Sequence, residues 1–466
     1  MRSLVFGIVF IGVMVVENAV AQVPAGALPE LVERGAYLAT AGDCAACHRD
    51  TASDHPLAGG YGIQSPMGVI YASNITPSVR DGIGHYTLED FITVMRQGKA
   101  PGGHYLYPAM PYTAFAGMSD RDLQALYSYL MLAVKPVDHQ VTKTSLPFPF
   151  SFRPVMGLWN KLFLDTTAVP GSEAPAASRE RGEYLVKTLT HCSTCHTPRN
   201  SLMAEQSDKF LAGSKVGGWS APNITPDRNA GIGQWSEQQL VTYLQTGALH
   251  GQAIAGGEMA TAVQNSFSKL NHDDLQAIAR YITSVPAIQG ETRHPSAEVT
   301  TSVDLGSIET GVASDPSALT QSTSMSGAQL YNGACATCHG SDGRGTHDPQ
   351  RFYPSLVGSS AVTNRDPANL IMTIAEGIDR KTPDAHAFMP AFKEQFTSEQ
   401  LAQVAEYVTQ HFGGNSAVQV SREQVERTMS GIDDSSWLIK YASWLTYGGL
   451  LLIVLVLVYI CRRRVS

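Results

Sequence analysis

Three stretches of the chain place a large apolar residue at every third position. Each stretch follows Ser, Thr or Asn, residue types that favour the N-cap position of a helix. The apolar positions are Leu123, Leu126 and Tyr129 in the first stretch, Leu275, Ile278 and Tyr281 in the second, and Leu401, Val404 and Tyr407 in the third. This spacing predicts three similar amphipathic helices. Shorter helices are expected earlier in each unit, for example over 31–38 and 179–187.

A different pattern occupies the C-terminal end, where residues 441–461 are almost continuously apolar. This length is enough for one helix to cross a bilayer. Four aromatic side chains suited to the membrane interface lie at its start, namely Trp437, Tyr441, Trp444 and Tyr447. Three arginines follow at 462–464, and the positive-inside tendency places them in the cytoplasm. The pattern predicts a single membrane anchor with a short cytoplasmic tail and the rest of the chain outside.

The N-terminal residues 1–21 have the pattern of a secretory signal peptide. Arg2 precedes an apolar stretch over 4–16, and the small residues of Ala19-Val20-Ala21 suit a cleavage site. The alternative is a buried first helix or a signal anchor. We expect export to the periplasm, with the mature chain starting at Gln22.

Length and charge narrow the possibilities further. The chain has 466 residues, a length that suggests about three domains. Its net charge is −8, and no long basic run occurs except at the extreme C-terminus. Phosphate binding needs a concentrated set of Lys and Arg, so nucleic acid is not an expected partner.

Six of the seven cysteines form three Cys-x-x-Cys pairs, and a histidine directly follows each pair. The motifs are Cys44, Cys47 and His48; Cys192, Cys195 and His196; and Cys335, Cys338 and His339. A disulfide framework would not explain the constant spacing or the histidine. Cys-x-x-Cys-His is typical of covalent haem attachment, with the histidine as proximal iron ligand. Three copies in an exported chain favour three haem c groups over zinc sites or thioredoxin-like pairs.

A methionine follows each motif at a distance that suits a sixth iron ligand. Met110 lies 62 residues beyond His48, Met259 lies 63 residues beyond His196, and Met389 lies 50 residues beyond His339. Histidine with methionine is the ligation expected of electron carriers, and it leaves no open position for a substrate. Each methionine could instead fill the core. The substitute ligands are His104, His250 and His386.

An internal repeat supports the same organisation. The run Asn-Ile-Thr-Pro at 74–77 recurs at 223–226, and the offset of 149 residues also maps Met110 onto Met259. Such self-similarity indicates duplicated structural units. We therefore expect an all-α fold of three tandem class I cytochrome c domains with long loops, plus the C-terminal transmembrane helix. The expected boundaries are 22–155, 156–293 and 326–412 for the domains, 294–325 for a linker and 413–440 for a juxtamembrane segment.

The chain resembles the triheme cytochrome c subunits of membrane-bound periplasmic dehydrogenases. These serve flavin-dependent gluconate, fructose and sorbitol dehydrogenases and quinohaemoprotein alcohol dehydrogenases. The matching stretches are 42–48, 71–77, 106–112, 191–199 and 259–281. The resemblance runs from about 30 to 412 and is looser in the third unit. Glu258 departs from the pattern, since relatives often have a small residue or proline there.

The resemblance implies that His48, His196 and His339 are proximal ligands and that Met110, Met259 and Met389 are distal ones. It also implies a large flavoprotein or quinoprotein partner at the periplasmic face, leaves room for a small third subunit, and makes membrane ubiquinone the electron acceptor. The chain has no dinucleotide fingerprint or flavin module of its own, so we do not expect it to be catalytic alone. The alternatives are a multihaem peroxidase with a five-coordinate haem and a stand-alone shuttle to a terminal oxidase.

Overall fold

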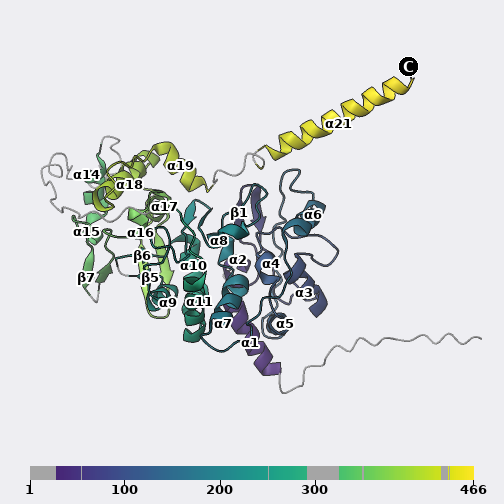
Figure 1. The fold of residues 1–466 in the computed structure, drawn as a ribbon, viewed down its shortest axis with the longest axis horizontal. Coiled ribbons are helices and arrows are strands. Elements are labelled where there is room, and N and C mark those ends of the chain that lie inside the picture. Colours follow the sequence, from purple (N-terminus) through teal and green to yellow (C-terminus); the bar gives the residue numbers. More distant parts are fainter. Residues whose placement is uncertain are drawn as a thin grey trace, which may run out of the picture.

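The computed structural model describes residues 28–290 without 54 and 250, residues 325–431 without 349 and 350, residue 439, and residues 441–465. The predicted signal peptide over 1–21 lies outside these residues, as does the predicted linker except for its last residue. Three helical units follow one another along the chain, and α21 extends away from them (Figure 1).

The first unit begins with a long helix and returns to it with the predicted closing helix. Its elements are α1 (Leu28–Ala41), α2 (Cys44–His48), β1 (Gly62–Ser65), β2 (Gly68–Tyr71), α3 (Leu88–Gln97), α4 (Tyr112–Phe115), α5 (Asp120–Leu132) and α6 (Pro154–Phe163). Helix α5 packs along α1. Its N-cap is Ser119, whose side chain accepts a hydrogen bond from the Asp122 N–H.

The second unit repeats this order, with a π-helical turn after its first helix. Its elements are α7 (Arg179–Tyr184), η1 (Leu185–Leu189), α8 (Ser193–His196), η2 (Ser207–Lys209), β3 (Ser214–Val216), β4 (Trp219–Ala221), α9 (Glu237–Thr246), β5 (Ala248–Leu249), β6 (Ala253–Ile254), α10 (Gly257–Asn265), η3 (Phe267–Lys269) and α11 (His272–Ser284). Asn271 caps α11 as predicted, and α11 packs against α7.

The third unit follows the same plan and ends with a helix that the sequence pattern did not predict. Its elements are α14 (Gly327–Ala334), α15 (Ala336–His339), β7 (Thr346–Asp348), β8 (Arg351–Tyr353), α16 (Ser360–Thr363), α17 (Ala368–Glu376), β9 (Ile378–Lys381), β10 (His386–Met389), α18 (Ser398–Phe412) and α19 (Arg422–Ser430). Helix α19 packs against α17 and α18 and buries Val425 completely. Much of the expected juxtamembrane segment therefore folds onto this unit.

One packing feature is common to all three units. A glycine in the first helix lies so close to the closing helix that a Cβ atom would clash with a backbone carbonyl oxygen. The three pairs are Gly35 with Ala125, Gly182 with Ala277, and Gly327 with Gln403. In each unit the added Cβ would also come too close to the Cβ of a tyrosine in the closing helix, namely Tyr129, Tyr281 and Tyr407. The same close helix crossing thus occurs three times.

The expected all-α class is too strict, because short strands occur within the long loops. The described residues form five two-stranded antiparallel sheets, which pair β1 with β2, β3 with β4, β5 with β6, β7 with β8, and β9 with β10. The β3–β4 turn is Gly217-Gly218, and both glycines have positive φ, as a two-residue hairpin requires. Such strands are too short to give a clear alternating pattern in the sequence.

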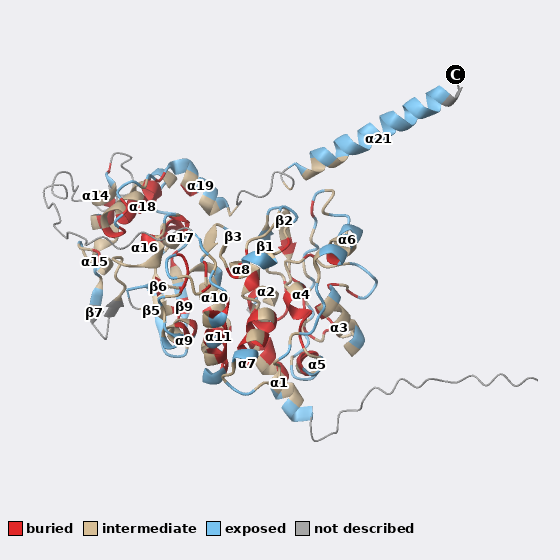
Figure 2. Cartoon of the chain, in the orientation of Figure 1, coloured by how far each residue is buried: buried red, intermediate tan, exposed pale blue. Residues whose placement is uncertain are grey.

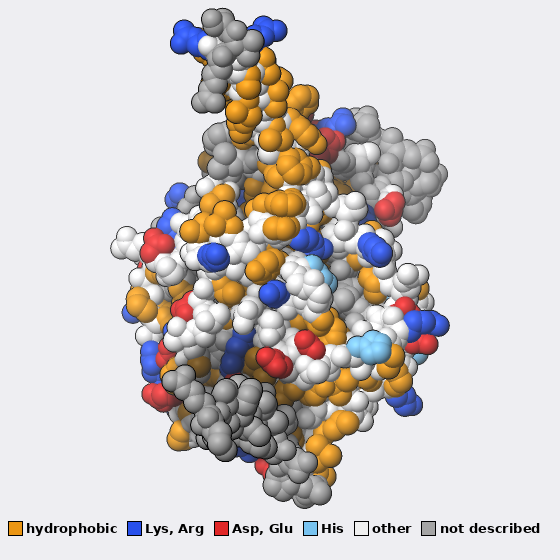
Figure 3. Space-filling model, turned by 90° about the vertical axis from the view of Figure 1, so that its right-hand side faces the viewer, with side chains coloured by type: hydrophobic (Ala, Val, Ile, Leu, Met, Phe, Trp, Pro, Cys, Tyr) orange, Lys and Arg blue, Asp and Glu red, His pale blue; other side chains and the backbone are white. Residues whose placement is uncertain are grey.

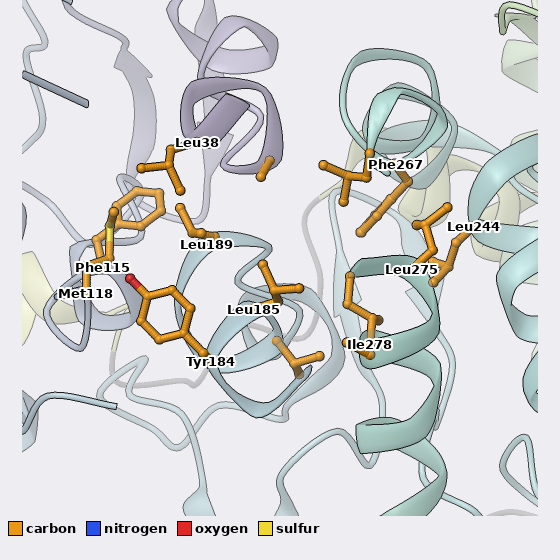
Figure 4. Packing of buried hydrophobic residues seen from close by; sticks show 14 of the residues in the cluster. Leu38, Phe115, Met118, Tyr184, Leu185, Leu189, Leu244, Phe267, Leu275 and Ile278 are labelled. Carbon is orange, nitrogen blue, oxygen red and sulfur yellow. The ribbon is translucent and has the colours of Figure 1, made fainter. Parts of the chain in front are cut away.

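The first two units share one hydrophobic core, whereas the third has its own. Leu38 and Phe115 of the first unit belong to the same buried cluster as Leu189 and Leu275 of the second (Figure 4). Helices α5, α11 and α18 turn buried faces toward these cores, while α21 is exposed along most of its length (Figure 2). The second and third units meet through an amide pair, in which Asn369 bonds the backbone N–H and C=O of Ser220.

Helix α21 (Ala442–Val465) covers most of the predicted transmembrane segment. It is the one helix among the described residues that is long and apolar enough to cross a membrane. Apolar side chains surround it and basic residues lie near its end (Figure 3).

Candidate haem c sites

The first Cys-x-x-Cys-His motif forms helix α2, directly after the chain turns out of α1. Asp43 makes this turn in the left-handed region, with φ of 48°. Cys44 and Cys47 are separated by less than one helical turn, and His48 ends the helix. The His48 Nδ1 lies 2.7 Å from the backbone oxygen of Ser73, which accepts its hydrogen bond. This bond fixes the tautomer and leaves Nε2 able to bind a metal.

The histidines of the other two motifs also bond a backbone carbonyl oxygen through Nδ1. The His196 Nδ1 lies 2.8 Å from the Pro222 oxygen, and the His339 Nδ1 lies 2.9 Å from the Pro354 oxygen. Burial lowers the pKa of all three imidazoles, so each is neutral near pH 7, as a metal ligand must be. The accepting carbonyls lie 15 to 26 residues beyond their histidines, so the motif itself gave no sign of them.

The Asn-Ile-Thr-Pro repeat explains how two of these carbonyls are held. Asn74 follows Ser73, and Asn223 follows Pro222. The Asn74 Oδ1 accepts bonds from both the backbone and the hydroxyl of Thr76, at 2.9 and 2.7 Å, and its Nδ2 donates to the Val137 oxygen. Asn223 repeats this set with Thr225 and Ile288. The repeated asparagine therefore ties the histidine-binding loop to the chain beyond the closing helix.

The six motif cysteines form no disulfide, and the surroundings of Cys44, Cys47, Cys195 and Cys335 do not favour a reactive thiolate. Burial raises the pKa of Cys44, Cys195 and Cys335 to about 12 and that of Cys47 to about 11. A thioredoxin-like pair or a zinc site would need lowered values. In the described parts of the chain, no group of three His, Cys, Asp or Glu side chains is arranged to hold a metal ion. Two partly buried thiols on one turn with a neutral histidine fit thioether attachment of haem.

The three methionines proposed as distal ligands lie in different local structures. Met110 precedes α4 and is held by a 3.2 Å bond from its N–H to the Tyr107 oxygen. Met259 lies in the first turn of α10, and Met389 ends β10. All three are partly buried. Met110 and Met259 pack against the core shared by the first two units, and Met389 packs against the core of the third unit.

Two of the substitute histidines lie at the surface of the molecule. His104 is exposed, and His386 is exposed and pairs with Asp379 at 2.7 Å. His250 lies outside the described residues.

Glu258, which departs from the family pattern, lies between the first and second motifs. Its carboxylate is 3.5 Å from the Tyr61 hydroxyl of the first unit. Its charge contributes, after burial, to the raised pKa values of Asp43, Cys47 and Cys195. One carboxylate of the second unit therefore acts on both motifs, which shows that these motifs lie close together.

Comparison with known proteins agrees with this geometry. A family model described as cytochrome C oxidase, cbb3-type, subunit III matches residues 322–408, which contain the third motif. The fructose dehydrogenase cytochrome subunit of Gluconobacter japonicus is 44% identical, over 88% of this chain and 84% of that protein. The quinone alcohol dehydrogenase cytochrome c subunit of Gluconobacter oxydans is 35% identical, over 90% and 86%.

A third relative is named for a dehydrogenase that acts on another substrate. The gluconate 2-dehydrogenase cytochrome c subunit of Pantoea cypripedii is 36% identical, over 85% of this chain and 88% of that protein. These relatives confirm the resemblance read from the sequence. The chain belongs to the family of cytochrome c subunits of dehydrogenases, in which it is an electron-transfer component and not the catalytic subunit.

Proposed function

We propose that each of the three units binds one haem c, and that the haems carry electrons from a dehydrogenase subunit to ubiquinone in the membrane. The observation that carries this proposal is the threefold recurrence of one arrangement. Each motif has two thiols on a helical turn and a histidine whose Nδ1 is bonded to a backbone carbonyl. Haem bound there supplies one-electron redox chemistry, and the chain supplies its attachment and ligands.

The residues that would hold the haems follow from the motifs. The covalent attachments are Cys44, Cys47, Cys192, Cys195, Cys335 and Cys338, the proximal ligands are His48, His196 and His339, and the distal ligands are Met110, Met259 and Met389. Methionine sulfur as the sixth ligand raises the reduction potential relative to two nitrogen ligands, which favours the reduced state. A chain with three such sites has no open iron position, which supports electron transfer over catalysis at haem.

The partner in this proposal is a large periplasmic dehydrogenase subunit, most simply a flavoprotein acting on a sugar, sugar acid or polyol. The fructose and gluconate dehydrogenase relatives support that class. A quinoprotein alcohol dehydrogenase is the second candidate, supported by the Gluconobacter oxydans relative. In this scheme α21 crosses the inner membrane and ends in a short cytoplasmic tail, so the haem units lie on the periplasmic side.

A mild-detergent pull-down of the tagged chain from its native membranes tests the proposal. We expect a large subunit to co-purify, and its substrate to reduce the haem absorption bands of the complex. A matched control is the Cys44→Ala/Cys47→Ala chain, which should lose one third of the haem absorbance. If three haems are present and no large subunit is recovered, the chain is a stand-alone shuttle. A high-spin iron that turns over peroxide would instead indicate a peroxidase.

A further inference from the structure

Helix α6 has its apolar face turned away from the protein. Val155, Leu158 and Leu162 lie at helical spacing on one side, with exposed fractions of 47%, 61% and 63%. Phe152, just before the helix, is 55% exposed. Helices that pack on a core normally show the reverse arrangement, with the apolar side inward. An outward stripe of this kind marks a surface that something else covers.

The inward face of α6 is already occupied, so the helix cannot simply turn over. Asn160 on this face is buried, accepts a 2.8 Å bond from the Tyr112 hydroxyl and donates a 2.8 Å bond to the Gln97 oxygen. Gly157 lies against the Tyr105 ring, where a Cβ atom would be too close. These contacts fix the rotation of the helix, and they direct its leucines outward.

The position of α6 in the molecule identifies what covers it. The chain just before α6 contacts the first turns of α21, where the Ser443 hydroxyl donates to the Phe148 oxygen and the Phe148 and Tyr447 rings lie 5.7 Å apart. Apolar side chains on the body gather at the base of α21 (Figure 3). The exposed stripe therefore lies beside the end of the helix that would enter the bilayer.

We propose that α6 lies in the surface of the membrane, with Phe152, Val155, Leu158 and Leu162 among the lipid acyl chains of the outer leaflet. Lys161, exposed in the last turn of α6, is placed to meet anionic lipid headgroups. Together with α21 this second attachment fixes how the haem units stand on the bilayer, which a single flexible anchor would not do. The inference rests on α21 crossing the membrane, as proposed above.

Spin labels on the haem-loaded full chain test this contact. In a Cys461→Ser background, nitroxides are attached at Leu158→Cys or Leu162→Cys in phosphatidylethanolamine–phosphatidylglycerol vesicles. Leu28→Cys, at the exposed start of α1, a helix on the opposite side of the body from α21 (Figure 1), is the control in water. Leu451→Cys, inside α21, reports separately whether the anchor spans the bilayer.

We expect labels at 158 and 162 to collide more with oxygen, which concentrates in lipid, than with a water-soluble nickel chelate. The label at 28 should show the opposite preference. The proposal is overturned if 158 and 162 behave like 28, or if both are shielded from both agents, because a protein partner would then cover the stripe. If the label at 451 collides more with oxygen and the label at 158 more with the nickel chelate, α21 spans the bilayer but α6 does not enter it. That result overturns only the proposed contact of α6 with lipid. Cross-linking of the unsubstituted chain by a diazirine-bearing phospholipid should mark 152–163.

Discussion

The Tyr37 hydroxyl on α1 donates a 2.6 Å hydrogen bond to Asp274 on α11, in the next unit. The relationship is reciprocal, because the Tyr184 hydroxyl on α7 donates a 2.5 Å bond to Asp122 on α5. Each aspartate is also paired with an arginine of its own unit, Arg34 with Asp122 and Arg181 with Asp274. The first two units thus exchange equivalent contacts, which explains why they share one core.

Replacing Asp274 with Asn should destabilise both units together. Arg181 donates to the two Asp274 oxygens at 2.8 and 2.9 Å and is 8% exposed, so the substitution leaves a buried guanidinium without its counter-charge. Breaking one side of a buried ion pair costs about 3–5 kcal/mol. The free energy of unfolding, followed by circular dichroism in denaturant, measures this loss.

Asp273→Asn is the matched control for that substitution. Asp273 is the exposed neighbour on the same helix, and we expect its change to stay within about 0.5 kcal/mol of the native protein. Equal effects of the two substitutions would show that the Arg181–Asp274 pair does not hold the units.

Gly35→Ala should damage the close crossing of α1 and α5. The added Cβ would clash with the Ala125 carbonyl and the Tyr129 Cβ, neither of which can yield without moving the closing helix. Overpacking of this kind costs about 1–3 kcal/mol, which outweighs the gain in helix propensity from alanine. Thermal unfolding should show a lower midpoint, whereas Glu33→Ala, at an exposed site on α1, should not. An unchanged midpoint for Gly35→Ala would contradict the observed crossing.

Asn74→Ala should loosen the loop that holds His48. The substitution removes the bonds to Thr76 and Val137, and with them the support of the neighbouring Ser73 oxygen. Leaving buried partners unsatisfied costs about 1–3 kcal/mol. We expect a shifted reduction potential for one haem of the loaded chain, because the histidine bond tunes its iron.

The exposed Asn229 provides the comparison for the Asn74 substitution. Asn229→Ala should leave all potentials unchanged in a spectroelectrochemical titration. If Asn74→Ala also left them unchanged, the Asn-Ile-Thr-Pro repeat would have no part in positioning the histidine.

Asp43 should make stability depend on pH near neutrality. Burial, reinforced by the charge of Glu258, raises its pKa to about 7, whereas an aspartate in an unfolded chain has a pKa of about 3.9. Between these values the folded state binds the extra proton, so stability falls as the pH rises toward 7. Asp43→Asn suits the left-handed φ and removes this titration.

The check is the free energy of unfolding from pH 4 to 8. The native protein should lose stability relative to Asp43→Asn by at most ~1.4 kcal/mol per pH unit over this window. Parallel curves for the two proteins would mean that Asp43 is already ionised in the folded state. Asp273→Asn should keep the native slope.

Patterns of residues close together in the sequence predict much of this structure. The haem motifs, the three closing helices with their caps and the apolar C-terminal helix depend on residues close together in the sequence, so spacing predicted them. The hydrogen bonds that Tyr37 and Tyr184 donate to the aspartate of the other unit join positions far apart in the sequence, and no sequence pattern predicts them. Helix α19 is largely polar and is fixed by the burial of Val425, which only packing reveals.

Coulometric reduction of the purified full chain shows whether it carries three electron-transferring haems. We expect three one-electron steps per polypeptide, all from low-spin iron with histidine and methionine ligands. Each of the single substitutions Met110→Ala, Met259→Ala and Met389→Ala should convert one iron to high spin. Fewer than three electrons per chain, or methionine ligation absent from all three irons of the native protein, would contradict this expectation.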